Sequence, residues 1–279
     1  MTHDPFQAGA TPGTTPAATI TSAANGRIKA LRLLRERKGR AATGLFLAEG
    51  EDALRMALDA GRTVASLVFD PGRAGAALQA MAERCAAGGA EMIPAGPAVL
   101  AALSGRDNPP RVVAALPQPW VALDALPVVR PAAFAVLEAP RDPRNLGAVA
   151  RSAEAAGVAG LILLGESCDP WGPDAVAASA GALLVLPVAR AGLEEFARWR
   201  ARHGVALAGT SLAAELDYRR APYGEAVAVA MGTETTGLSE ELAGACDLLV
   251  KIPMRGRVDS LNLAVAAGLM IFAVTEAQR

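Results

Sequence analysis

The feature that most constrains the fold is an alternation of apolar and helical segments in the C-terminal half of the chain. The runs 134–137, 160–164 and 226–231 contain no charged residue, and sequences with helical periodicity separate them. A strand that is apolar on both faces must be covered on both sides, which is typical of a parallel sheet flanked by helices. The sequence therefore predicts an α/β domain with a mostly parallel sheet.

A smaller α/β alternation precedes this region, with strands expected near 45–47, 64–69, 91–93 and 111–116. Four prolines between residues 117 and 131 interrupt mixed sequence and indicate a linker. The first residues are rich in Thr, Pro, Ala and Gly without periodicity, which favours disorder. We therefore divide the chain into a disordered tail (1–22), a small domain (23–117), a linker (118–131) and a larger domain (132–279).

The charge of the whole chain does not favour nucleic-acid binding, because the formal net charge is −1. A local basic patch is nevertheless present on a helix predicted to start near Asn25. Ile28, Leu31 and Leu34 form its apolar face, and the other face carries a single acid, Glu36. The basic residues that we take as candidates for RNA phosphate contacts are Arg27, Lys29, Arg32, Arg35, Lys38 and Arg40. The alternative is a solvated helix face with no partner.

The cysteines and histidines argue against a structural metal. Cys85, Cys168 and Cys246 form no CxxC pair, and His3 and His203 are equally isolated, so we expect no metal site. We expect a reducing, cytoplasmic compartment, and we find no signal-peptide pattern at the N-terminus. The longest apolar run, 263–274, is too short to span a bilayer, so we expect no membrane partner.

Polar residues follow a buried strand at 138–147, where a helix is predicted to begin. Ligands of parallel sheets bind at the carboxyl ends of the strands. Asn145 lies in the first turn of this helix and Arg151 follows about two turns later. The alternative is that Asp142 caps the helix and Arg151 is a solvated charge.

A second polar segment, 231–237, also follows a buried strand. Gly232 and Gly237 allow a ligand to approach the backbone closely. A loop ending in an N-cap at Ser239 explains the second glycine but not Glu234, which lies between two apolar elements. The segment has neither the spacing of a phosphate-binding P-loop nor a dinucleotide-binding glycine fingerprint.

The third polar segment, Ser260-Leu-Asn262, opens a predicted helix over 260–276. Ser260 is placed to cap this helix. Asn262 would then lie in the helix interior, where asparagine is unfavourable, so we expect a buried amide with a hydrogen-bond partner. The helix carries little polarity on any face and must be buried, for example at a subunit interface.

Taken together and in this order, the three segments resemble the SpoU (TrmH) class of knotted RNA 2′-O-ribose methyltransferases. The matching positions are Asn145, Gly147 and Arg151, then Gly232, Glu234, Gly237, Leu238 and Ile252-Pro-Met254, and finally Ser260, Leu261 and Asn262. The resemblance covers roughly 132–277. Thr235 is a departure, because many relatives have glycine there. More weakly, the stretch from Arg40 to Gly50 is similar to the start of a ribosomal-protein-like RNA-binding domain.

The resemblance implies a deep trefoil knot, a homodimer, and S-adenosylmethionine bound in a bent shape. It implies that Gly232, Ile252 and Leu261 bind this cofactor, and less directly Thr210, Ser211 and Met254. The residues that it implies for catalysis are Asn145, Arg151, Glu234, Ser260 and Asn262. The expected activity is 2′-O-methylation of ribose in RNA, with ribosomal RNA favoured by the separate N-terminal domain.

Other functions remain open from the sequence. Transfer RNA is an alternative substrate, and an enzyme that methylates ribosomal RNA against an antibiotic has a similar architecture. A non-catalytic RNA-binding protein of the same fold is disfavoured because the polar positions of all three segments are present. A nucleotide-dependent oxidoreductase is disfavoured by the missing glycine fingerprint.

Overall fold

The computed structural model describes residues 18–279, which form two compact units. One comprises the chain up to Gln118 together with Trp171–Pro173, and the other comprises Pro119–Pro170 and Asp174–Arg279. Most of the expected tail, 1–17, lies outside the described residues. Its end is ordered, contrary to expectation, because the Ile20 amide donates to the Pro94 carbonyl at 2.8 Å and forms a parallel bridge to Ala95.

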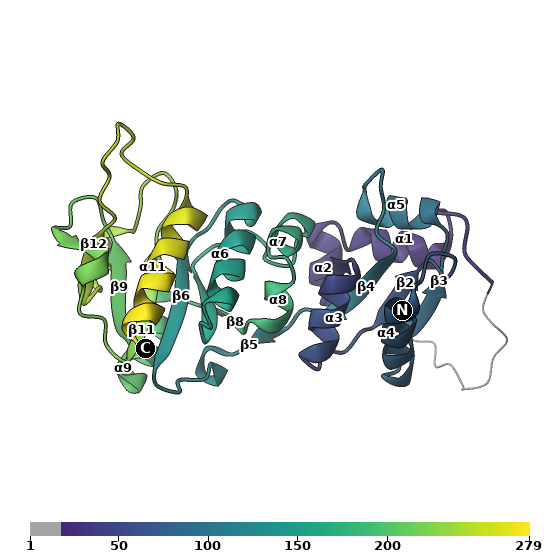
Figure 1. Ribbon diagram of the computed structural model, residues 1–279, viewed down its shortest axis with the longest axis horizontal. Coiled ribbons are helices and arrows are strands. Elements are labelled where there is room, and N and C mark those ends of the chain that lie inside the picture. Colours follow the sequence, from purple (N-terminus) through teal and green to yellow (C-terminus); the bar gives the residue numbers. More distant parts are fainter. Residues whose placement is uncertain (1–17) are drawn as a thin grey trace. The chain divides into compact units, whose positions relative to one another are not determined.

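The first unit is built on a four-stranded mixed sheet with the order β1-β4-β2-β3. Figure 1 labels three of these strands, β2, β3 and β4. Strand β4 runs antiparallel to β1 and β2, whereas β2 and β3 are parallel. Its elements are α1 (Gly26–Leu33), α2 (Arg37–Thr43), β1 (Leu45–Glu49), α3 (Glu51–Asp59), β2 (Ser66–Phe69), α4 (Ala76–Ala87), β3 (Glu91–Pro94), α5 (Pro97–Ser104) and β4 (Val112–Pro117).

The basic helix expected from residue 25 onwards is in fact two helices. Asn25 caps α1, which ends at Leu33, and α2 begins at Arg37. Gly39 makes the break possible, because a Cβ at this position would lie 2.0 Å from the Leu33 carbonyl oxygen. The second helix therefore packs directly against the end of the first, and its residues do not continue the same face.

The second unit contains an eight-stranded sheet in the order β10-β12-β9-β11-β6-β7-β8-β5, and all of its neighbouring strands are parallel. This confirms the predicted mostly parallel sheet. Its elements are β5 (Trp120–Val121), η1 (Leu123–Ala125), β6 (Ala132–Glu138), α6 (Pro143–Ala155), β7 (Gly160–Leu164), α7 (Pro173–Ala178), α8 (Ala182–Val185), β8 (Val188–Ala191), α9 (Leu193–His203), β9 (Ala206–Thr210), β10 (Leu216–Asp217), η2 (Tyr218–Arg220), β11 (Ala226–Met231), α10 (Glu240–Gly244), β12 (Leu248–Lys251) and α11 (Leu263–Ala277).

Local differences from the predicted elements have simple causes. The expected strand at 183–188 is the short helix α8 followed by β8, because a short apolar run does not distinguish a buried helix from a buried strand. The stretch 118–131, expected to be a linker, contributes β5 and η1, and Trp120 of β5 pairs with Val188 of β8.

The carboxyl ends of the central strands lie along the same end of this sheet. The register pairs Met231 of β11 with Leu137 of β6, so Gly232 and Glu138 leave the sheet together. Likewise, Val250 of β12 pairs with Thr210 of β9. Helix α11 packs on α6 and across β6 and β11, which brings its N-terminus to the same edge (Figure 1). Within residues 18–279, no helix is long and apolar enough to cross a membrane.

Candidate active site

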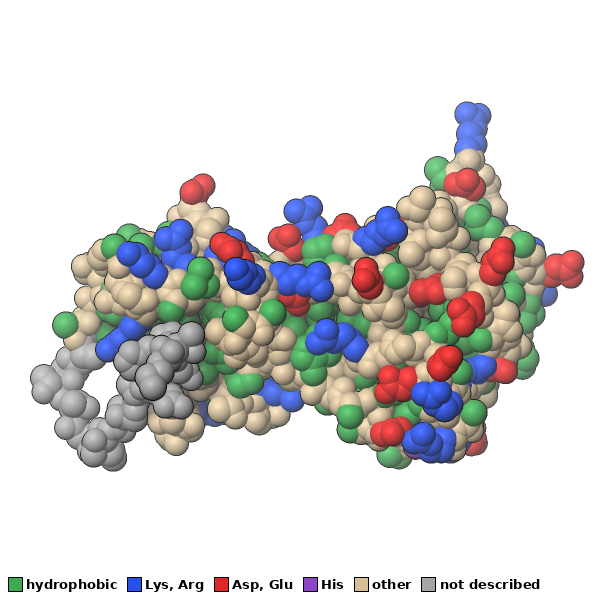
Figure 2. All heavy atoms as spheres, turned by 180° about the vertical axis from the view of Figure 1, so that it is seen from behind, with side chains coloured by type: hydrophobic (Ala, Val, Ile, Leu, Met, Phe, Trp, Pro, Cys, Tyr) green, Lys and Arg blue, Asp and Glu red, His purple; other side chains and the backbone are tan. Residues whose placement is uncertain are grey.

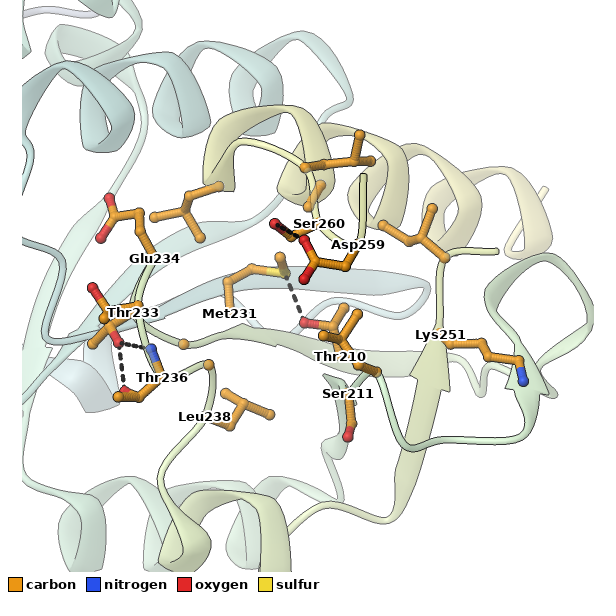
Figure 3. Close-up of a pocket in the computed structure, with 18 of the residues that line it drawn as sticks. Thr210, Ser211, Met231, Thr233, Glu234, Thr236, Leu238, Lys251, Asp259 and Ser260 are labelled. Carbon is orange, nitrogen blue, oxygen red and sulfur yellow. Dashed lines mark hydrogen bonds between the residues drawn. The ribbon is translucent and has the colours of Figure 1, made fainter. Parts of the chain in front are cut away.

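A cavity of about 530 Å³ opens at the carboxyl ends of β9, β11 and β12, next to the segment that leads into α11 (Figure 3). The loops that follow these strands supply most of its wall. All six residues expected to bind a cofactor line it, namely Thr210, Ser211, Gly232, Ile252, Met254 and Leu261. The fold thus collects residues from distant parts of the sequence into one pocket.

The loop after β11 folds into a tight hairpin over Gly232. The amides and carbonyls of Thr233 and Gly237 are joined by two reciprocal hydrogen bonds of 3.0 Å, and Gly237 has a φ of +70°. A Cβ on Gly232 would lie 2.0 Å from the Gly237 carbonyl carbon and oxygen, so only glycine fits there. Thr235, at the tip, is not among the positive-φ residues of the described chain, so its backbone conformation does not require glycine at this position.

Glu138 fixes the far end of this loop and was not anticipated from the sequence as a site residue. The Ser239 hydroxyl donates to Glu138 Oε1 at 2.5 Å, and the Ser239 amide donates to Oε2 at 2.8 Å. The same hydroxyl accepts from the Leu242 amide and caps α10. The sequence did contain a signal for this residue, because Glu138 is the single acid at the end of an otherwise apolar strand. The Glu138 carboxylate holds the loop after β11 against the end of β6.

A chain of side-chain hydrogen bonds joins the three polar segments. Asn262 Nδ2 donates to Asn145 Oδ1 at 3.0 Å, and Asn145 Nδ2 donates to Glu234 Oε1 at 2.8 Å. The first turn of α6, the loop after β11 and the N-terminus of α11 thereby fix one another, and Glu234 also lines the cavity. This relay (Asn262, Asn145 and Glu234) brings the expected polar groups together.

Two expectations about the third segment are wrong. Helix α11 begins at Leu263, so Asn262, not Ser260, is its N-cap, and its Oδ1 accepts from the Ala264 amide at 2.9 Å. Asn262 is exposed instead of buried, which removes the difficulty of an asparagine inside a helix. Ser260 lines the cavity and donates to Asp259 Oδ1 at 3.3 Å.

Arg151 stands apart from the relay. It is exposed on α6 and does not line the cavity. No hydrogen bond or ion pair with another residue in the described part of the chain holds its guanidinium. Its neighbour Ser152 faces α11, because a Cβ on Gly268 would lie 3.5 Å from the Ser152 hydroxyl.

The basic residues of α1 and α2 differ in their surroundings. Lys29, Arg32 and Lys38 are exposed and form no ion pair with the described residues. Arg27 is exposed as well, and it lies 3.3 Å from Glu91. Further basic side chains are spread over the face of this unit that Figure 2 shows.

Arg35 and Arg40 instead support the fold. Arg35 Nη1 donates to the Leu103 carbonyl at 2.9 Å and lies 3.8 Å from Glu49. Arg40 is only 4% exposed, and its Nη1 donates to the Leu34 carbonyl at 2.8 Å. Because Arg40 lies on the second of two helices, it turns inward to the carbonyls at the end of the first. We therefore remove Arg40 from the residues considered for RNA contacts.

The Cys246 thiol is a weak nucleophile. Burial raises the pKa of the Cys246 thiol to about 11, so it stays protonated near neutral pH. Residues 18–279 contain no group of three or more His, Cys, Asp or Glu arranged to hold a metal ion.

Each of the two units matches a known protein family. Residues 132–272 match the SpoU rRNA Methylase family, and residues 25–114 match an MRM3-like substrate binding domain. The chain is 33% identical over 267 residues to the 23S rRNA (uridine(2479)-2′-O)-methyltransferase of Streptomyces viridochromogenes, which covers 92% of each chain.

Two further relatives span nearly the whole chain. The 23S rRNA (guanosine(2553)-2′-O)-methyltransferase RlmP of Bacillus subtilis is 28% identical over 254 residues, covering 91% of this chain and 97% of its own. The crystal structure of an AdoMet-bound rRNA methyltransferase from Sinorhizobium meliloti superposes with a TM-score of 0.86 at 36% identity, covering 93% and 97% of the two chains. The chain belongs to the SpoU rRNA methylase family.

Proposed function

We propose that the protein transfers the methyl group of S-adenosylmethionine to a ribose 2′-hydroxyl of ribosomal RNA. The observation that carries the proposal is the relay of Asn262, Asn145 and Glu234 at the edge of the cavity. Relatives of nearly full length are 23S rRNA 2′-O-methyltransferases, and a close structural neighbour binds AdoMet.

The cavity suits the cofactor in size and chemistry. Its volume of about 530 Å³ lies within the range of roughly 300–1,000 Å³ that is usual for pockets of drug-sized ligands. Gly232, Ile252 and Leu261 offer backbone and apolar contacts, while Thr210 and Ser211 bring hydroxyls and Met254 a flexible side chain. When bound, S-adenosylmethionine supplies a methyl group on a positively charged sulfur, which makes that group ready for transfer.

The side chains of the site have to prepare the acceptor. A ribose hydroxyl is a weak nucleophile and must lose its proton as it attacks. Asn145 orients Glu234, and Asn262 orients Asn145, so the loop after β11 and the N-termini of α6 and α11 can hold the acceptor in one fixed geometry. Ser260 adds a hydroxyl on the cavity wall. We assign to these residues the positioning of the acceptor ribose against the donor.

We assign an electrostatic role to Arg151. A guanidinium is always protonated in proteins, so it does not act as a base. It can bind the phosphate next to the target ribose and stabilise the negative charge that develops on the attacking oxygen. Its lack of partners within the described chain leaves it available for RNA.

We further propose that the protein is a homodimer that associates through α11. Val265, Leu269 and Phe272 are 52%, 38% and 50% exposed and follow one another at helical spacing. A second copy is the occupant we propose, because the same stripe on both copies is self-complementary about a two-fold axis. Helix α6, which carries Arg151, packs on α11, so such a dimer would bring a second copy close to Arg151.

The remaining proposals concern organisation. We propose that the first unit binds RNA phosphates through Lys29, Arg32 and Lys38, that the second unit, which begins at Pro119, is the catalytic one, and that the protein works in the cytoplasm with its substrate. We also propose that the chain is knotted. After β12, at the outer part of the sheet, the chain returns to α11 on β6 and β11, a path compatible with a trefoil knot.

The test is to map 2′-O-methylated nucleotides in total RNA from cells with and without the gene, and from deleted cells that express Arg151→Ala. We expect one site in ribosomal RNA to disappear on deletion and to stay absent with Arg151→Ala. Loss of a site in transfer RNA instead would establish the alternative substrate. If no site is lost, the protein is not a methyltransferase under these conditions, and a non-catalytic RNA-binding role becomes the better account.

A further inference from the structure

We propose that the carboxylate of Asp259 makes the cavity selective for the positively charged methyl donor over its neutral product, S-adenosylhomocysteine. The inference rests on the proposed function and adds a specificity-determining residue to it. Asp259 precedes the third polar segment and has no part in the relay of Asn262, Asn145 and Glu234.

The position of Asp259 is the first observation. It belongs to the segment between β12 and α11 and lines the cavity. Figure 3 shows its carboxylate turned into the cavity and the hydrogen bond that Ser260 makes to it. No positively charged side chain in the described part of the chain forms an ion pair with this carboxylate. Its negative charge is therefore left for a ligand.

The charge balance of the wall is the second observation. Among the lining residues only Glu234, Lys251 and Asp259 carry a formal charge, which gives a net charge of −1. Glu234 accepts a hydrogen bond from Asn145 outside the lining set. S-Adenosylmethionine carries a sulfonium, an ammonium and a carboxylate, a net charge of +1, whereas the product has lost the sulfonium charge and is neutral overall. The wall thus complements the donor and not the product.

This difference matters because donor and product share every other group. Both present the same adenosine and the same amino acid portion, so the pocket can distinguish them only by the methyl group and its charge. Asp259 is exposed, so water screens it and the expected discrimination is modest. In such surroundings, a carboxylate a few ångströms from a cation should favour binding of the charged donor over the neutral product by roughly 3- to 10-fold.

The experiment measures the affinities of purified full-length protein for three ligands by isothermal titration calorimetry. They are S-adenosylmethionine, S-adenosylhomocysteine and sinefungin, which carries an amine in place of the sulfonium and is also positively charged there. For Asp259→Asn we expect the affinities for S-adenosylmethionine and sinefungin to fall roughly 3- to 10-fold, while that for S-adenosylhomocysteine changes less than about twofold. Asp259→Glu, which keeps the charge, should restore most of the preference.

A matched control is Glu225→Gln. It removes the same charge from the same unit, but Glu225 precedes β11 at the end opposite to the cavity. All three affinities of Glu225→Gln should equal those of the wild type. In a separate titration at higher salt, the preference of the wild type for the two charged ligands should shrink.

Two results would overturn the inference. One is an equal loss of affinity for all three ligands in Asp259→Asn, because Asp259 would then act on a shared group or on the loop itself. The other is an unchanged ratio of affinities in this variant. If the wild type binds none of the three ligands, the proposed function fails and the inference with it, so the two failures are distinguishable.

Discussion

Replacing Gly232 with alanine tests whether the hairpin after β11 shapes the cofactor cavity. The added Cβ would lie 2.0 Å from the Gly237 carbonyl carbon and oxygen and 2.1 Å from the Leu238 amide nitrogen. Since these are backbone atoms, no side chain can turn away, and the hairpin must shift by about 1 Å or more to reach ordinary contact. Forced overpacking of this kind costs typically about 1–3 kcal/mol.

That cost should appear in one of two measurements. If the hairpin moves in the free protein, binding S-adenosylmethionine must restore its shape, and the affinity falls roughly 5- to 150-fold. If the strain is present with and without cofactor, the midpoint of thermal unfolding falls instead, by roughly 2–4 °C per kcal/mol for a domain of this size. Titration calorimetry and thermal unfolding on the same samples distinguish the two.

Gly224→Ala is the matched control, because nothing lies within 4 Å of a Cβ at this position, which is not among the positive-φ glycines. It precedes the same strand at the end opposite to the cavity. We expect it to leave both the affinity and the unfolding midpoint unchanged. Wild-type values in both measurements for Gly232→Ala would refute the close packing of this hairpin.

Three further predictions concern residues outside the cavity wall. Arg40→Ala removes a buried hydrogen bond to the Leu34 carbonyl and should lower the free energy of unfolding, measured in urea, by about 1–3 kcal/mol; an unchanged midpoint would contradict its structural role. Replacing Lys29, Arg32 and Lys38 together with glutamine should weaken RNA binding and flatten its dependence on log salt concentration by about 2, whereas an unchanged slope would exclude phosphate contacts. Burial raises the pKa of Cys246 to about 11, so mass spectrometry should show it alkylated at pH 8 roughly 10- to 100-fold more slowly than a free thiol; labelling at the rate of a free thiol would contradict this.

The parallel sheet was predictable because its central strands are apolar on both faces. Strand β11 reads Ala-Val-Ala-Val-Ala-Met, so as a strand it is apolar on both faces and has to be covered on both sides. The edge at which ligands bind follows from the parallel arrangement, and the glycines and polar residues after β6 and β11 mark that edge. The three polar segments were therefore recognisable as parts of one site.

Several details depended on packing that the sequence does not encode locally. A basic residue on a helix reads as solvated, and only the break between α1 and α2 turns Arg40 inward. Ser260 and Asn262 are both good caps; the residue that caps α11 is Asn262, which also contacts Asn145, 117 positions away. In the sequence, Glu138 is only the last residue of a strand. Its role depends on the loop that carries Ser239, which contacts it in the folded structure.

The central claim is methyl transfer to a ribose hydroxyl through the site that Asn145 organises. The most direct measurement incubates the purified protein with labelled S-adenosylmethionine and ribosomal RNA, then identifies the labelled nucleoside by digestion and mass spectrometry. We predict a single 2′-O-methylated nucleoside with the wild type. Asn145→Ala, which separates Glu234 from Asn262, should yield at least about tenfold less of it at saturating cofactor. A nucleoside methylated on its base, or equal transfer by both proteins, would contradict the account.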